Sequence, residues 1–311
     1  MIDRPIAEPE RQLPLGGEIF LDHVGHFVAD PEAASAALAR AGFAPTPPSV
    51  QVNPNPAGGQ PQLTGTGNIT AMLARGYIEV LFRTADTPLG RELEVSRARY
   101  PGIHLAAFAV ADAGAAHRRL AAAEFRVRPL VDMQRPAATE EGTGTAAFTI
   151  ARVEPDVMPE GRMQILTHRT EHTVWQPRWL THPNSASALL DLVIAVSDVE
   201  EAARRFSRFT DRRALPSAFG ASIGLDRGRL ELMHADALLR LLPELRIPDL
   251  PFAAACGIRV RSLETAADAL RRGDVGFERS GEALIVPFPP ALGVGTWLFV
   301  ERPGGLIWRQ G

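Results

Sequence analysis

Two short motifs in the sequence have residue types and spacings that could do chemistry. His168–His172 (HRTEH) matches the H-x-x-E-H pattern of zinc peptidases, in which a helix places both histidines on one face and the glutamate activates water. An apolar, strand-like stretch, Met163–Leu166, precedes this motif and Pro177 follows it, so a helix is not expected here. Gly220–Gly224 (GASIG) matches the nucleophile elbow G-x-S-x-G, which requires a helix after the serine, whereas Ser222 is followed by another strand-like stretch. We interpret both motifs as chance matches.

The composition excludes several other chemistries. The chain has 311 residues, and all 33 of its basic residues are arginine. The absence of lysine excludes a P-loop lysine, a Schiff-base lysine and a pyridoxal-phosphate anchor. The single cysteine, Cys256, excludes an internal disulfide, a CxxC redox pair and a thiolate metal cluster.

Charge and hydropathy bear on partners and location. The formal net charge is −3, which argues against nucleic acid or an anionic membrane surface as the main partner. No apolar run approaches the ~20 residues of a membrane helix. Met1–Gly17 contains acids and prolines where a signal peptide would have an apolar core. We expect a cytoplasmic protein that binds a small molecule and neither nucleic acid nor membrane, and a homodimer stays open.

The elements that must position any site follow one pattern, which begins four times along the chain. Each time an apolar strand is followed by a capping Asp or Ser and an amphipathic, Ala-rich or Arg-rich helix. Three shorter strand candidates come after each helix; in the second unit these are Arg126–Val131, Ala146–Ile150 and Arg162–Leu166. The leading strands are Phe20–Val28, Ile103–Val110, Leu189–Val196 and Ala255–Val260, with the caps Asp30, Asp112, Asp198 and Ser262.

Four β-α-β-β-β units in succession predict an α+β fold with internal repeats. Each unit is too small to bury its own sheet, so we expect the units to pair into shared cores. The predicted organisation is an extended N-terminal arm over residues 1–17, a first domain over residues 18–182 and a second over residues 188–311. The polar, turn-rich stretch His182–Ala188 (HPNSASA) joins the two domains.

With this repeat, the chain resembles the vicinal-oxygen-chelate superfamily, which includes glyoxalase I, extradiol dioxygenases and bleomycin-resistance proteins. The residues that carry the resemblance are Leu21–Ala34 (LDHVGHFVADPEAA), Gly76–Phe82 (GYIEVLF) and Leu189–Ala203 (LLDLVIAVSDVEEAA). More narrowly, the chain is similar to the uncharacterised glyoxalase-like domain group through Thr167–Asn184 (THRTEHTVWQPRWLTHPN). The resemblance implies four βαβββ modules paired into two cup-shaped domains. It does not fix the reaction, because the fold supports many chemistries.

The resemblance also implies where a divalent metal such as Ni, Zn, Mn or Fe would bind. In this superfamily the ligands come from the first and last strands of each unit and face into the cup. His23 lies seven residues before Asp30, at the position of the first ligand, and Glu79 matches the carboxylate of the last strand. In unit two, Gln164 corresponds to Glu79.

The fourth ligand position of this cup is the weak one. It holds Leu105, which cannot bind a metal. His104 is one residue away, and a one-residue slip turns a side chain to the opposite face unless a bulge corrects it. The expected metal ligands are therefore His23, Glu79, Gln164 and His104. Glu79 could also be the catalytic base.

Several other polar and aromatic residues lie near the expected cup but outside its four ligand positions. His26 should face the helix layer as a packing residue, and His168 is predicted to extend the cup face to its rim. Trp175 could cover the mouth and contact substrate, or pack between domains. The second cup offers Asp191 and Glu231 but no histidine, so a ring-cleaving dioxygenase, which needs two His and one carboxylate there, is not expected.

Two hypotheses from different classes remain. The first is a metal-dependent glyoxalase-type enzyme, a lyase or isomerase, acting on a small oxygen-rich substrate. The alternative is a metal-free protein that binds or sequesters an organic compound, as bleomycin-resistance proteins do. His23 and Glu79 favour the first, whereas Leu105 and the weak donor Gln164 favour the second.

Overall fold

The computed structural model describes residues 11–55 and 57–310, and its element order repeats β-α-β-β-β four times. The first unit is β1 (Ile19–Phe27), α1 (Pro31–Arg40), β2 (Ser49–Asn53), β3 (Gln62–Met72) and β4 (Tyr77–Arg83). The second is β5 (Gly102–Val110), α3 (Ala113–Ala122), β6 (Val131–Thr139), β7 (Gly142–Arg152) and β8 (Arg162–His168). The third is β9 (Ala186–Val196), α5 (Val199–Thr210), β10 (Ala214–Ser217), β11 (Gly220–Gly224) and β12 (Arg229–His234). The fourth is β13 (Phe252–Val260), α7 (Leu263–Arg272), β14 (Glu278–Ser280), β15 (Ala283–Pro287) and β16 (Thr296–Val300).

Capping residues explain where the four main helices begin. The Asp30 carboxylate accepts from the backbone N–H groups of Glu32 and Ala33, and Asp112, Asp198 and Ser262 each accept from the residue three positions on. Such caps satisfy backbone donors that the first helical turn leaves without partners. The predicted caps are confirmed.

Three further α-helices lie outside the repeat and were not expected from the sequence. α2 (Pro88–Arg99) connects units one and two, and α6 (Ala235–Leu241) connects units three and four. α4 (Glu171–Val174) follows β8 and includes part of the HRTEH motif, but His168 is on the strand, so the two histidines do not share a helix face. No helix in the described ranges is long and apolar enough to cross a membrane.

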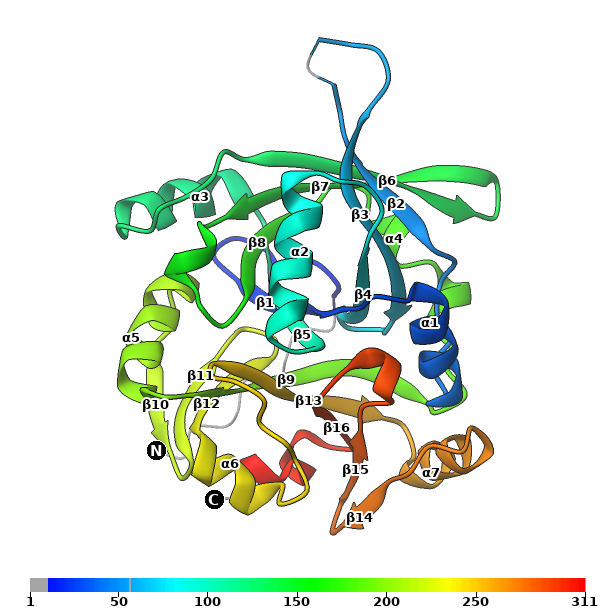
Figure 1. The fold of residues 1–311 in the computed structure, drawn as a ribbon, viewed down its shortest axis with the longest axis vertical. Coiled ribbons are helices and arrows are strands. Elements are labelled where there is room, and N and C mark those ends of the chain that lie inside the picture. Colours follow the sequence, from blue (N-terminus) through cyan, green and yellow to red (C-terminus); the bar gives the residue numbers. More distant parts are fainter. Residues whose placement is uncertain (1–10, 56, 311) are drawn as a thin grey trace.

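The first two units close into a ring of strands. Its order is β1-β4-β3-β2-β6-β7-β8-β5, and β5 pairs back onto β1. At the opposite seam β2 and β6 meet through one residue pair, Val52 and Gln134. An eight-stranded ring of this kind has an interior just wide enough for side chains or one small ligand. This is the N-terminal cup, in the upper half of Figure 1.

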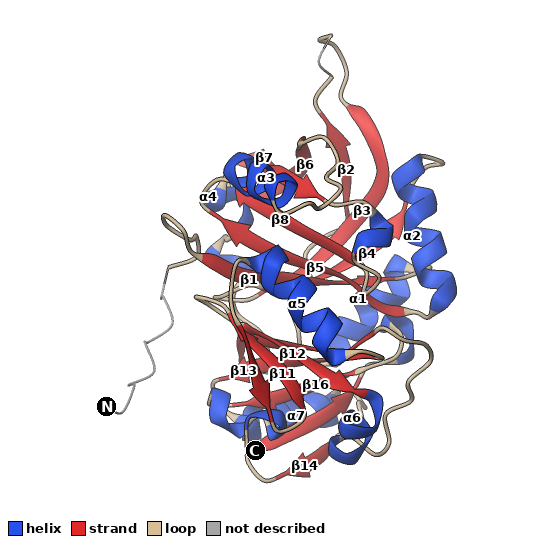
Figure 2. Cartoon of the chain, turned by 90° about the vertical axis from the view of Figure 1, so that its left-hand side faces the viewer, coloured by secondary structure: helices blue, strands red, loops and turns tan. Residues whose placement is uncertain are grey.

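The last two units form a second curved sheet in the order β10-β11-β12-β9-β13-β16-β15-β14. No pairing joins β10 to β14 among the described residues, so this C-terminal cup stays open on one side. The two curved sheets stack on each other in Figure 2, and the pair Ala253–Ile103 connects β13 to β5. The α+β fold of four βαβββ modules in two cups is therefore as predicted.

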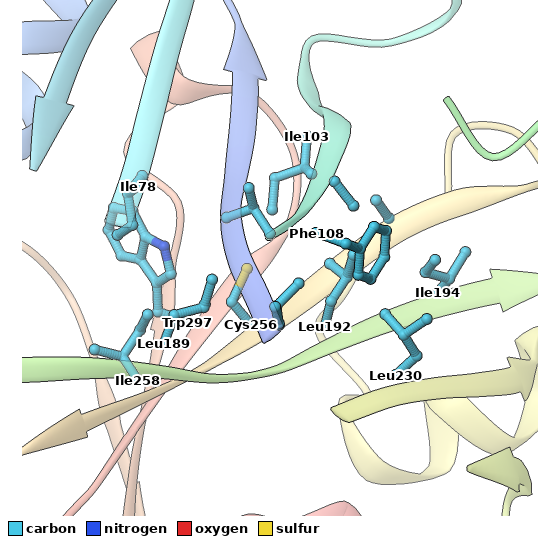
Figure 3. Packing of buried hydrophobic residues seen from close by; sticks show 14 of the residues in the cluster. Ile78, Ile103, Phe108, Leu189, Leu192, Ile194, Leu230, Cys256, Ile258 and Trp297 are labelled. Atoms are coloured by element: carbon cyan, nitrogen blue, oxygen red, sulfur yellow. The ribbon is translucent and has the colours of Figure 1, made fainter. Parts of the chain in front are cut away.

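An apolar core joins the two cups. Figure 3 shows Ile78 of β4 and Phe108 of β5 near Leu192 of β9, Cys256 of β13 and Trp297 of β16. All five side chains are fully buried. Burial raises the pKa of the Cys256 thiol, which keeps it neutral and unreactive.

One strand was predicted in the wrong place. Arg126–Val131 was expected to be a strand, but β6 begins only at Val131, and Val127 makes just an isolated bridge to Val153. Residues 131–139 were not expected to form a strand, because Pro136 lies among them and proline cannot donate a hydrogen bond to a neighbouring strand. Here the proline is tolerated because β6 is almost an edge strand, paired to β2 at a single position.

Candidate active site in the N-terminal cup

A bulge in β1 places two consecutive polar side chains together. Leu21 pairs with Phe108 of β5 and His23 pairs with the next residue, Ala107, so Asp22 is an extra residue in β1. A bulge interrupts the alternation of a strand and re-aims its side chains. The Asp22 carboxylate accepts from the Nδ1 of His23 at 2.7 Å while both side chains are buried.

Asp22 connects two histidines from different strands. Its second oxygen lies 3.0 Å from the Nε2 of His168, at the end of β8. Although burial alone would raise it, these two histidines hold the pKa of Asp22 well below its usual range. Because Asp22 fixes Nδ1 of His23, the other ring nitrogen of His23 is free to face the interior of the cup.

His23 and Glu79 form an ion pair inside the cup. Nε2 of His23 lies 3.4 Å from Oε2 of Glu79, on β4, and the Nδ2 of Asn68 donates to Oε1 of Glu79 at 2.6 Å. Burial alone would lower the pKa of His23, but the hydrogen bond to Asp22 and the interaction with Glu79 raise it to about 9. Burial would likewise raise the pKa of Glu79, but His23 and Asn68 keep it below its ordinary value. The ring of Tyr77 stacks on His23 with centroids 4.2 Å apart.

A small chamber surrounds this pair. Its polar walls include Gln164 of β8 and the arginines Arg135 of β6, Arg152 at the end of β7 and Arg162 at the start of β8. The Nε of Arg152 donates to Oε1 of Gln164 at 3.1 Å. The free space is about 20 Å³, enough for about one water molecule. Leu81, Leu105 and Phe148 are among its apolar walls.

The structure brings together some of the predicted site residues. His23, Glu79 and Gln164 line the chamber, whereas His104 does not. The Nε2 of His104 bonds the backbone oxygen of Tyr100 at 2.6 Å, the His104 ring stacks on that of Tyr100, and burial lowers the pKa of His104 to about 4. Gly25 pairs with Leu105 and His26 with Ile103, so His104 is an extra residue in β5. This irregularity does not bring His104 into the chamber, and Leu105 keeps the inward position.

The predicted contact residues lie behind the chamber wall. His168 is held by Asp22, and Trp175 packs edge-on against His168, with centroids 4.6 Å apart. Neither is among the residues that line the chamber. His26 is a packing residue, as predicted, but it packs against the C-terminal cup and not against the helix layer. Its ring contacts that of Phe288, its Nδ1 lies 2.9 Å from the backbone oxygen of Leu292, and burial lowers its pKa to about 4.

The equivalent position of the C-terminal cup is filled by the chain itself. Asp191 accepts from the indole N–H of Trp308 at 2.8 Å and from the Nε of Arg309 at 2.8 Å. Leu306 and Trp308 are buried in the apolar cluster of this cup. Glu231 is 1% exposed, and burial together with the charge of Asp191 raises its pKa to about 7.

The N-terminal donor set does not fit a resident metal ion. Catalytic zinc sites use three protein ligands, and non-haem iron sites use two histidines and a carboxylate. Here one histidine and one carboxylate pair with each other, and Gln164 accepts from Arg152. In the described part of the chain no group of three or more His, Cys, Asp or Glu is arranged to hold a metal.

Sequence reasoning missed Asp22, Asn68 and the three arginines. An Asp-His dipeptide on an apolar strand was a usable signal for Asp22, since one of two adjacent residues should face the core. Asn68 and Arg135 gave no such signal, because their meaning depends on which strands become neighbours.

Paired βαβββ units with a polar chamber inside the first cup define a member of the vicinal-oxygen-chelate superfamily. The model of the glyoxalase-like domain family matches residues 21–210. The chain therefore belongs to the glyoxalase-like domain family. No curated protein matches the chain.

Solved structures share the fold at low sequence identity. A hypothetical protein from Staphylococcus aureus is 9% identical, with a TM-score of 0.64 over 90% of this chain and 98% of that one. A mutant of 4-hydroxymandelate synthase from Streptomyces coelicolor is 13% identical, with a TM-score of 0.57 over 92% and 93%. A xylose isomerase-like TIM barrel/4-hydroxyphenylpyruvate dioxygenase fusion protein is 10% identical, with a TM-score of 0.55 over 93% of this chain and 50% of that one. At these identities the likeness extends to the fold alone.

Proposed function

We propose that the N-terminal cup binds a small organic ligand without a resident metal ion and that His23 and Glu79 exchange a proton with it. The observation that carries this proposal is the pairing of the expected metal donors. His23 is bound to Glu79 and Asp22, and the oxygen of Gln164 is bound to Arg152. Donors that already satisfy each other form an acid–base pair more readily than a coordination sphere.

The geometry suits proton transfer. Asp22 accepts at Nδ1 of His23, so the proton available for transfer is on Nε2, which faces Glu79 and the chamber. A buttressed imidazole of this kind is the usual general acid or base in enzymes. With its pKa raised to about 9, His23 is protonated at neutral pH and supplies the acid. Glu79, ionised, supplies the base.

A second candidate is the metal-dependent lyase or isomerase of glyoxalase type. It is supported by one feature, the approach of His23 Nε2 and Glu79 Oε2 to the same chamber. A divalent ion there would act as a Lewis acid toward substrate oxygens. Its binding would require His23 to lose the proton that faces Glu79.

Elemental analysis separates the two candidates. The protein is purified without chelator or affinity tag, soaked in Ni, Zn, Mn or Fe(II), and desalted, together with His23→Ala and the exposed-histidine control His234→Ala. We expect no near-stoichiometric metal in any of the three proteins. Near-stoichiometric metal that His23→Ala loses and His234→Ala keeps would overturn the proposal in favour of the metal enzyme. Native mass spectrometry of the same samples looks for a co-purifying organic molecule.

A further inference from the structure

Two arginines stand between the chamber and a larger groove. Arg152 and Arg162 line the chamber that contains His23 and Glu79, and both also line a groove of about 810 Å³. The groove runs along α2, the end of β7 and the segment around Leu250. Ligand pockets have volumes of about 300–1,000 Å³. The groove has room for an organic molecule that the chamber cannot hold.

Neither arginine has a carboxylate within ion-pair distance among the described residues. The Nε of Arg152 donates to the neutral amide of Gln164, and the guanidinium of Arg162 lies over the ring of Phe27, 5.1 Å from its centroid. Burial lowers the pKa of Arg152 to about 9, and the nearby charge of Arg162 acts in the same direction. Both arginines are half-buried. A partly desolvated charge without an opposite partner is costly, so an anion that enters from outside would be favoured here.

The acids near these arginines already pair with other groups. Of the acids, Glu92 of α2 has the largest electrostatic effect on Arg152 and Arg162. Its two oxygens, however, already accept hydrogen bonds from Arg128, and the shorter of these contacts is 2.9 Å. Glu79 acts on both at longer range and pairs with His23. Around the same groove Arg99 pairs with Asp249 at 2.9 Å. The chain thus supplies carboxylates to its other groove arginines and none to Arg152 and Arg162.

The remaining wall of the groove is largely apolar. It includes Val95, which is 69% exposed, together with Val153, Met158, Met163 and Leu250. An exposed valine beside buried methionines is suited to an apolar group. The groove therefore offers two guanidinium groups at its inner end and apolar contacts along its length.

We propose that Arg152 and Arg162 bind the oxyanion group of an amphipathic organic anion whose apolar body lies in this groove. The inference rests on the proposed function, because it names the class of ligand whose charged end reaches the chamber of His23 and Glu79. Guanidinium groups bind planar oxyanions such as carboxylates through paired, charge-assisted hydrogen bonds. A carboxylate at this position would pair with both half-buried arginines and offset the cost of their partial desolvation.

Isothermal titration calorimetry with simple carboxylates tests the proposal. The ligands are 4-phenylbutyrate and octanoate, each compared with its neutral amide, at low and at physiological ionic strength. We expect at least one carboxylate to bind, its amide to bind about tenfold to hundredfold more weakly, and the affinity to fall with salt. Phenyl phosphate, tested in parallel, shows whether the site prefers a carboxylate or a phosphate.

Variants locate the binding site. Arg162→Gln should weaken carboxylate binding about tenfold or more. The matched control is Arg91→Gln, because Arg91 lines the same groove but is exposed and pairs with Asp86. Its effect should stay within about twofold. Thermal unfolding of both variants checks that they fold. Arg162→Gln should be at least as stable as the parent, because it removes a half-buried charge without an ionic partner.

Three results would overturn the inference: no binding by either carboxylate, equal binding of acid and amide, or equal weakening by Arg162→Gln and Arg91→Gln. These outcomes are independent of the metal analysis. A metal-free cup that binds no anion would leave the proposed function standing and remove only the class of ligand. A metal bound through His23 would remove the proposed function even if anions bind at the arginines.

Discussion

Replacing Asp22 with asparagine should strongly lower the pKa of His23. The folded protein raises that pKa from 6.5 to about 9, and the first favourable cause is the hydrogen bond from His23 to Asp22. This difference corresponds to about 3 kcal/mol in favour of the protonated ring. His23 is 2% exposed, so solvent does not screen the interaction appreciably. Asp22→Asn removes the negative charge beside Nδ1, while burial still lowers the pKa and Glu79 still raises it. We therefore expect the pKa of His23 to fall well below its value in the parent protein.

The titration is followed by NMR on protein labelled at the histidine rings. His23→Gln identifies the resonances of His23, and His182, which is buried but bonds only backbone groups, is the internal control that should not change. The parent protein tests the reasoning even if Asp22→Asn folds poorly. A parent His23 that titrates near 6.5, or a pKa unchanged in Asp22→Asn, would refute the assigned role of Asp22.

The same shift predicts a pH dependence of stability. A histidine with a raised folded pKa contributes stability that is fully present below its unfolded value and is lost as the pH rises through its folded value. For His23 the loss should therefore occur between pH 6.5 and about 9. Urea unfolding across this range should show the decline in the parent protein and much less of it in Asp22→Asn.

Three further predictions concern the C-terminal cup and one turn. The pKa of Glu231 is raised from 4.5 to about 7, so the folded protein loses stability as the pH rises through this window and the carboxyl group ionises. Glu231→Gln should therefore raise the free energy of unfolding by up to about 3 kcal/mol at pH 8 and leave it unchanged at pH 4, as measured by urea unfolding. Trp308→Ala should lower the free energy of unfolding by about 3–5 kcal/mol, because it empties a buried site and removes a donor to Asp191; a loss below about 1 kcal/mol would contradict the packing described here. Gly76→Ala should cost about 1–3 kcal/mol in thermal unfolding, since Gly76 has φ +71° and an added Cβ would lie 2.8 Å from the backbone oxygen of Asp22.

Local signals were enough to predict the repeat from the sequence. Asp30, Asp112, Asp198 and Ser262 each follow an apolar strand, and each caps a helix through contacts within three residues. Such contacts depend on neighbouring residues alone, so they survive in any fold that contains the helix. α2 has the same local signal, because Thr87 accepts from the N–H of Gly90 and Pro88 is its first residue, but it has no clear apolar face, since only Gly90 and Leu93 are buried.

The chemistry of the chamber depended on contacts that no local pattern contains. Gln164 could be placed on the correct strand face, but its partner Arg152 comes from the neighbouring strand. His104 and Leu105 could not be ranked from the sequence, because β5 has an irregularity at His104 that depends on its pairing with β1. The sequence therefore indicated which residues face inward more reliably than it indicated what they bind.

The two cups carry acids at matching positions, and each cup neutralises its acid in a different way. Glu79 and Glu231 are on the last strands of units one and three and pair with Gly25 and Val193 of the first strands. The polar residues two positions earlier on those strands are His23 and Asp191. In the N-terminal cup the pair is cation and anion, so it is stable and faces free space. In the C-terminal cup both residues are acids, and their repulsion is relieved by Arg309 on Asp191 and by the raised pKa of Glu231. The segment that carries Arg309 also places Leu306 and Trp308 in the apolar cluster of this cup. The same segment therefore neutralises Asp191 and occupies the space beside it.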